Sequence, residues 1–324
     1  MEFPNTPFLG GAADIPVNSP TPIMSYSPMT LEAEGRRVPL DIKITAPATG
    51  SNLPIILLSH GHGPSSYLSS YKGYGPIVDW WAGHGFVVIQ PTHLSSRQLG
   101  YQLDAENVRE LFMDQRVKDM HRILDNLDNI EETVPFLKGR LDKDKIAVAA
   151  HSLGSLTANI LMGAVNTDPR DNEKMDLYSP RIKAGFIMGA LGNGTTDMSE
   201  GGSNMMPFYN IDFSNMKTPC LVAWGDSDVS PHLTTRGADW HADPYNESPG
   251  PKASYEITGG KHGFGGVSGW DALECQDESA ERLAAVQRVS WAYLMSQLYP
   301  EDDSWEKAKK AIASHSEIGK IEEK

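Results

Sequence analysis

The sequence has little cysteine, no long apolar run and no excess of basic residues. Only Cys220 and Cys275 are cysteines among the 324 residues, and two cysteines do not make the disulfide framework of a small secreted domain. No apolar stretch approaches the roughly 18 residues that a membrane-spanning helix needs. A chain of this length can bury roughly three quarters of its unfolded surface, so its core needs neither disulfide nor metal. These absences predict a soluble, globular protein.

The charge balance is strongly acidic. Against 42 acidic residues there are 28 basic ones, a formal net charge of −14, which repels phosphate backbones and anionic membrane surfaces. Nucleic acid is therefore excluded as a partner. Cys220 lies in the apolar run Cys220–Trp224 and is expected to be a buried thiol, although a Cys220–Cys275 bridge remains open.

Residues 1–29 are rich in proline, glycine, serine and asparagine, and residues 1–25 are predicted to be irregular. They lack the basic start and apolar middle of a secretory signal. We expect a cytoplasmic protein, or a secreted one whose signal has been removed.

Short β-branched runs alternate with helical stretches between residues 26 and 300, which predicts one α/β domain with a mostly parallel sheet covered on both faces. Helices are expected at Tyr74–Gly83, Val108–Leu127, Ser152–Val165 and Ala280–Leu298. Residues 92–107 and 189–217 are long connections that could form a lid, and 301–324 reads as a charged tail, a solvated helix or frayed end. Eight strands are predicted, at Tyr26–Leu31, Val38–Thr45, Leu53–Ser59, Phe86–Gln90, Ile146–Ala150, Ala184–Met188, Leu221–Trp224 and Ser254–Ile257.

The strongest local signal is a strand that turns at once into a helix at Ser152. Small residues two positions before and after the serine, Ala150 and Gly154, are what a tight nucleophile-bearing turn requires. The following helix points its N-terminus at the serine and favours negative charge there. The backbone N–H of Leu153 is then one oxyanion donor. A strand followed by a serine-capped helix is the alternative.

A second glycine-rich turn, His60-Gly61-His62-Gly63, ends an earlier strand. Where a nucleophile lies on such a strand-to-helix turn, the backbone after an earlier strand can supply the other oxyanion donor, here the N–H of His62. Two histidines at this spacing also allow a zinc site, but the further ligands that zinc usually has are missing. The sequence therefore predicts no metal and no cofactor.

Two later loops carry the groups that would activate the serine. Asp228 follows a buried strand and is the expected triad acid, with Asp226 as the turn-forming residue or, alternatively, the acid itself. His262 lies in a glycine-rich loop after the last strand, where a core histidine is uncommon. The chain order Ser152, Asp228, His262 is the serine–acid–histidine order of α/β-hydrolases.

With these motifs placed, residues 35 to 298 resemble the α/β-hydrolase superfamily, and within it the platelet-activating-factor acetylhydrolase and dienelactone-hydrolase-like esterases. The resemblance rests on the four motifs and on Trp81-Ala-Gly-His-Gly85, Arg116-Val-Lys-Asp119 and Leu137-Lys-Gly139-Arg140. Ala150 replaces the commoner glycine, and Ser155 stands where many relatives have another. Dienelactone hydrolases use a cysteine nucleophile, so Ser152 argues against their activity.

The resemblance implies an eight-stranded α/β-hydrolase fold and a serine esterase acting on a small-molecule or lipid-like hydrophobic ester. Met206, in a methionine-rich segment, and Trp224 and Phe264, beside the acid and the base, are candidate pocket residues. Other acyl hydrolases (a thioesterase, an amidase or a polyester-degrading enzyme) use the same triad. A non-catalytic ligand-binding member of the fold is the alternative from another class.

Overall fold

A nine-stranded mixed sheet runs through the computed structural model, which describes residues 8–100 and 111–324. Six neighbouring strands, β4-β3-β5-β8-β10-β11, are parallel; β1, β2 and β12 are joined by antiparallel pairing. The strands are β1 Ile23–Leu31, β2 Leu40–Pro47, β3 Leu53–Ser59, β4 Val87–Pro91, β5 Leu141–His151, β8 Ile182–Met188, β10 Cys220–Gly225, β11 Lys252–Ile257 and β12 Lys320–Glu323.

The α/β class, the mostly parallel sheet and all eight expected strands are confirmed, with ends shifted by a few residues. The continuous apolar run of β3 is buried at every position, as expected for a strand covered on both faces. The sheet has nine strands where eight were predicted, because β12 pairs antiparallel with β11.

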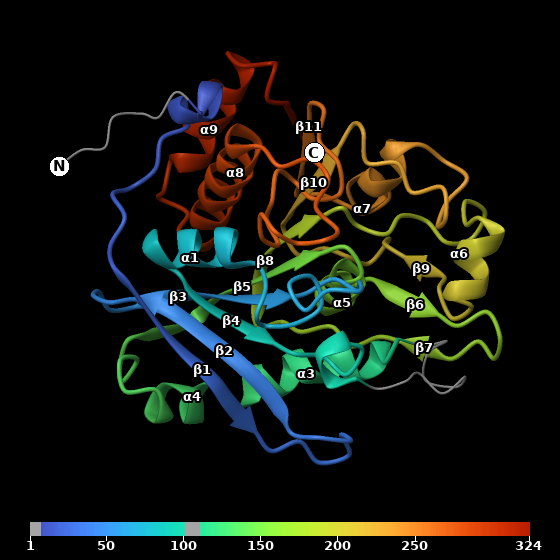
Figure 1. The fold of residues 1–324 in the computed structure, drawn as a ribbon, viewed down its shortest axis with the longest axis horizontal. Helices are drawn as coiled ribbons and strands as arrows, with labels where there is room; N and C mark the ends of the chain where they lie inside the picture. The colour runs from blue at the N-terminus through green and yellow to red at the C-terminus, as the bar shows by residue number, and fades with distance from the viewer. Residues whose placement is uncertain (1–7, 101–110) are drawn as a thin grey trace.

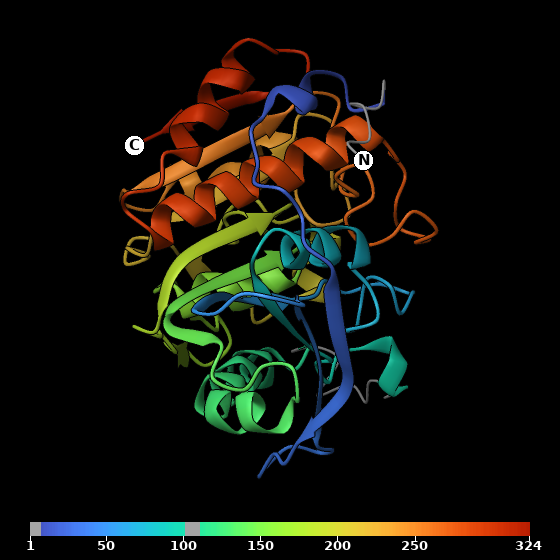
Figure 2. The ribbon, with the colours of Figure 1, turned by 90° about the vertical axis from the view of Figure 1, so that its left-hand side faces the viewer.

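Helices cover both faces of the sheet (Figure 1). On one face lie α1 (Gly75–Gly83), α8 (Ala280–Leu298) and α9 (Ser304–Ala313), with the short 3₁₀ helix Gly10–Asp14. On the other lie α3 (Met113–Asp125), α4 (Leu127–Thr133) and α5 (Gly154–Leu161). In Figure 2 the red α8 and α9 lie at the top of the molecule and the green α3 and α4 at the bottom. The sheet thus separates two apolar cores.

The C-terminal segment was expected to be a solvated helix or frayed tail; it does contain a helix, α9, but that helix is packed against the core. α9 buries Trp305, Ala308 and Ile312 against the α8 side of the core. The Trp305 indole donates a hydrogen bond to Glu323 of β12 at 2.6 Å. The lysine and glutamate residues that suggested a solvated tail lie on the outer side of elements whose apolar residues face inward.

Several connections between the main strands carry small elements of their own. A three-stranded sheet is formed by β6 (Val165–Thr167), β7 (Lys174–Met175) and β9 (Ile211–Asp212). Helix α6 (Glu200–Met205) lies in the expected lid segment 189–217, and the 3₁₀ helix Ala238–Ala242 and α7 (Asp243–Asn246) lie in the connection between β10 and β11. Of the other expected lid segment, residues 101–107 lie outside the described part of the chain.

Both cysteines are free and buried, so the bridge that the sequence left open is absent. Burial raises the pKa of the Cys220 thiol to about 12, which keeps it protonated and chemically inert. Within the described ranges, no helix is long and apolar enough to cross a membrane.

Candidate active site

Ser152 lies at the turn between β5 and α5, in a strained conformation. Its φ of +54° is in the left-handed region that side chains other than glycine rarely adopt,. The Ser152 N–H donates to the carbonyl of Met188 on the neighbouring β8 at 2.9 Å, which holds the turn in place. Strain of this kind persists where surrounding structure enforces it, commonly at functional sites.

The turn is pressed against the end of β3, and Gly154 makes this approach possible. A Cβ atom at Gly154 would lie 2.2 Å from the carbonyl oxygen of Ser59 and 2.8 Å from that of His60, well inside any real contact. Ala150, at the other small position, is completely buried. Backbone packing therefore requires a glycine at position 154, and the burial of Ala150 agrees with the small residue that the sequence singled out there.

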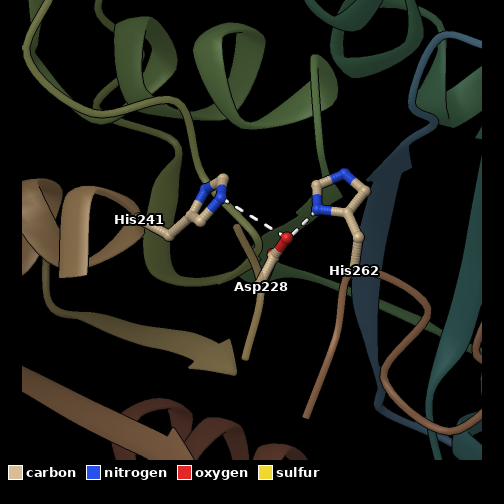
Figure 3. A group of neighbouring side chains, drawn as sticks. All are labelled: Asp228, His241 and His262. Atoms are coloured by element: carbon tan, nitrogen blue, oxygen red, sulfur yellow. Dashed lines mark hydrogen bonds and ion pairs between the residues drawn. The ribbon is translucent and has the colours of Figure 1, made fainter. Parts of the chain in front are cut away.

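Asp228 and His262 are brought together by the loops after β10 and β11 (Figure 3). The His262 Nδ1–H donates to Asp228 Oδ2 at 2.8 Å, because a carboxylate at neutral pH can only accept. Asp228 is 2% exposed, whereas the His262 side chain is 35% exposed. Nε2 of His262 is then the unprotonated nitrogen, the atom that a general base needs.

This pairing shifts the ionisation of both groups. Burial opposes the charged form of His262, but the charge of Asp228 and its hydrogen bond raise the pKa of the imidazole above its ordinary value of 6.5. Burial likewise opposes ionisation of Asp228, but His262 lowers the pKa of that carboxyl. Asp226, the alternative acid, instead accepts hydrogen bonds from the Gly259 N–H and the Ser227 hydroxyl.

The two expected oxyanion donors are unengaged. Among the described residues, neither the His62 N–H nor the Leu153 N–H has an acceptor. His62, Leu153 and Ser152 line the same cavity. The structure therefore leaves two backbone donors free beside the serine.

Arg116 connects the two segments that carry these donors. In the sequence analysis it appeared only within the motif Arg116-Val-Lys-Asp119, which supported the resemblance to esterases. It is completely buried on α3. Its guanidinium donates to the carbonyl of His60 and, at 3.3 Å, to the hydroxyl of Thr157 on α5. A third bond, of 2.7 Å, goes to the Ser95 hydroxyl. One side chain thus bridges the end of β3 and the nucleophile helix.

A cavity of about 420 Å³ contains the site, lined by Ser152, Asp228 and His262. Its apolar lining residues include Leu68, Leu111, Leu191, Met205, Met206 and Leu233. Met206, a candidate pocket residue from the sequence, is among these lining residues and lies in segment 189–217.

Trp224 and Phe264 were expected in the pocket but are not among its lining residues. The Trp224 indole donates to Ser254 Oγ of β11 at 3.1 Å. Phe264 is completely buried, and its ring meets that of His151 edge-on. Proximity in sequence to the acid and the base did not determine the direction of either side chain.

A histidine that sequence reasoning passed over lies beside the acid. His241, in the 3₁₀ helix Ala238–Ala242, is 1% exposed, and its Nε2 lies 3.5 Å from Asp228 Oδ1. Burial lowers the pKa of His241 below 6.5, although Asp228 favours its charged form. His241, Asp228 and His262 are the one group with metal-binding spacing in the part of the chain searched.

The earlier zinc alternative, His60 and His62, has no such geometry. Nδ1 of His60 bonds the Gly61 carbonyl at 2.6 Å, and its Nε2 accepts from the His93 N–H at 3.0 Å. Both ring nitrogens of His60 are thus used within the chain, which leaves no lone pair for a metal.

No known protein-family model matches this chain, and no curated protein sequence matches it.

Proposed function

We propose that this protein is a serine hydrolase of the α/β-hydrolase fold that cleaves carboxylic esters. The observation that carries the proposal is the shared cavity. Ser152, on a strained strand-to-helix turn, and the hydrogen-bonded pair Asp228–His262 line one cavity although three separate loops supply them. Nucleophile, base and orienting acid are the elements of a catalytic triad.

The reaction follows from these roles. Nε2 of His262 takes the Ser152 proton as the oxygen attacks the ester carbonyl, and Asp228 stabilises the imidazolium that forms. The N–H groups of Leu153 and His62 donate to the developing oxyanion. The imidazolium then protonates the leaving alcohol, and water attacks the acyl-enzyme by the same route.

The cavity favours an ester with an apolar portion. Leucine and methionine side chains are among the residues that line the cavity, and thioethers adapt to irregular apolar ligands,. Lys261, Glu274 and Gln276 are among its polar lining residues. We infer a hydrophobic small-molecule or lipid-like ester whose acyl or alkyl chain contacts the apolar residues.

Hydrolysis of p-nitrophenyl esters from acetyl to palmitoyl tests the proposal, with Ser152→Ala measured alongside. We expect activity in the wild type and a loss of at least ~10⁴-fold in kcat in the variant. A fluorophosphonate probe should label the wild type and not the variant. Ester hydrolysis undiminished in Ser152→Ala would refute the assignment; labelling without ester hydrolysis would move the reaction to amides or thioesters.

A further inference from the structure

We propose that Asp228, His241 and His262 form a binding site for a divalent transition-metal cation such as Zn²⁺, and that the bound cation reversibly inhibits the proposed catalytic site. The binding stands on the geometry of the three side chains; the inactivation also rests on the proposed function.

Three ligand atoms converge at this point (Figure 3). One atom from each of the three side chains lies within 4.8 Å of the other two. Asp228 uses a different carboxylate oxygen toward each histidine, Oδ2 at 2.8 Å from His262 and Oδ1 at 3.5 Å from His241. Small side-chain movements would bring three donors around one ion.

A hydrogen bond from Nδ1 of His241 leaves its Nε2 with a lone pair that can bind a metal. Its Nδ1 lies 2.5 Å from the carbonyl oxygen of Ala190, and since a carbonyl only accepts, Nδ1 carries the proton. In neutral imidazole the second nitrogen then has a lone pair. Metal-binding histidines are commonly oriented by this same bond from their other nitrogen to a backbone carbonyl.

The lone pair on His241 Nε2 faces Asp228 Oδ1, an oxygen of a negatively charged carboxylate. Apart from Asp228, the Ser230 hydroxyl is the other polar neighbour of His241 Nε2, at 3.4 Å. With Nδ1 protonated, the Ser230 hydroxyl can donate to Nε2, but the contact is long for an O–H···N hydrogen bond,. A bound metal ion would take the Nε2 lone pair and the carboxylate oxygen as ligands in place of this long hydrogen bond.

The donor set selects the class of ion. Two imidazole nitrogens and one carboxylate oxygen, with a further position left for water, are the ligands of many zinc sites. Calcium and magnesium prefer sites built from oxygen alone. All three residues line the cavity, which offers a route to the ion, and the net charge of −14 attracts cations,.

Binding at His262 Nδ1 would stop the proposed reaction without any net loss of a proton. The Nδ1 proton moves to Nε2 as the metal takes its place, so the imidazole stays neutral. Nε2 then has no lone pair to accept the Ser152 proton. Removing the metal returns the proton to Nδ1 and restores the base.

Titration of the full-length protein with Zn²⁺ by calorimetry, and with Co²⁺ followed by its visible absorption, tests the site directly. We expect one ion per chain and a loss of at least ~10-fold in affinity in His241→Phe. His232→Phe is the matched control, because His232 is an exposed histidine of the same cavity outside the cluster. Equal affinity in His241→Phe and wild type, or a loss confined to His232→Phe, would overturn the proposal.

His262→Ala provides a second variant should the buried His241 tolerate no substitution. Its side chain is 35% exposed, and we expect the same loss of metal affinity. Inhibition is then measured on p-nitrophenyl ester hydrolysis in wild type and His232→Phe, with reversal by a chelator. Metal binding without any ester hydrolysis would refute the esterase and keep the site, whereas hydrolysis without metal binding would refute the site alone.

Discussion

Gly154→Ala should separate the nucleophile turn from the end of β3. The added methyl group would lie 2.2 Å from the Ser59 carbonyl oxygen, whereas ordinary contact begins at 3.4 Å, so the two backbones must move apart by about 1 Å. The Gly154 Cα, which would carry the methyl group, and the Ser59 carbonyl both belong to the main chain, so neither can rotate away from the contact. The turn carries the Leu153 N–H, and β3 leads to the His62 N–H, so the spacing of the expected oxyanion donors changes.

A displacement of about 1 Å at a reacting group can cost ~10²-fold in rate, and we expect that loss in kcat with a smaller change in KM. Overpacking of this kind also costs ~1–3 kcal/mol. With an unfolding entropy of ~2.1 cal/mol/K per residue over 324 residues, the melting temperature should fall by about 1–4 °C.

Gly75→Ala is the matched control, since Gly75 begins α1 as Gly154 begins α5. A Cβ atom there would lie 3.9 Å from its nearest neighbour, Asp79 Oδ2. Steady-state kinetics on a p-nitrophenyl ester and thermal melting compare the two variants with wild type. Full activity and an unchanged melting temperature in Gly154→Ala would refute the argument that the close approach is needed.

Further predictions concern pH, the buried arginine and the terminal strand. Because a base works unprotonated and the pKa of His262 is raised, kcat/KM should fall as pH drops through a value above 6.5; Asp228→Asn should move that limb to lower pH and lower the maximum by ~10⁴-fold. Arg116→Lys keeps the positive charge but loses the branched guanidinium, and each buried acceptor left unpaired costs ~1–3 kcal/mol. The melting temperature and kcat should both fall, whereas the control Arg181→Lys, at a side chain that is 40% exposed, should show a smaller fall in melting temperature and no change in kcat. Deleting residues 320–324 removes β12 and should destabilise the protein in urea unfolding without changing KM.

Local sequence patterns were sufficient for most of the secondary structure. Continuous apolar runs such as Leu53–Ser59 predict buried parallel strands, and α8 was placed at its observed bounds, because both follow from periodicity within a few residues. The small residues around Ser152 and the order of acid and histidine were also readable, since a tight turn constrains its own residues.

The surroundings of the site were not readable in the same way. His241 reaches Asp228, and Arg116 bridges His60 to α5, through contacts between segments distant in the chain. No local pattern marks such a contact, because it depends on which faces of the sheet and helices pack together. Trp224 was misplaced for the same reason: adjacency to the acid says nothing of which way a strand residue points.

The fold class, the strands and the candidate triad thus followed from spacing along the chain, where neighbouring residues restrict one another directly. The ninth strand, the shape of the cavity and the second histidine beside Asp228 arose from packing, since β12 pairs with β11 residues that lie 64 to 70 positions earlier in the sequence,. Apolar periodicity determines which side of an element is buried. The identity of the partner across that face is a property of the whole chain.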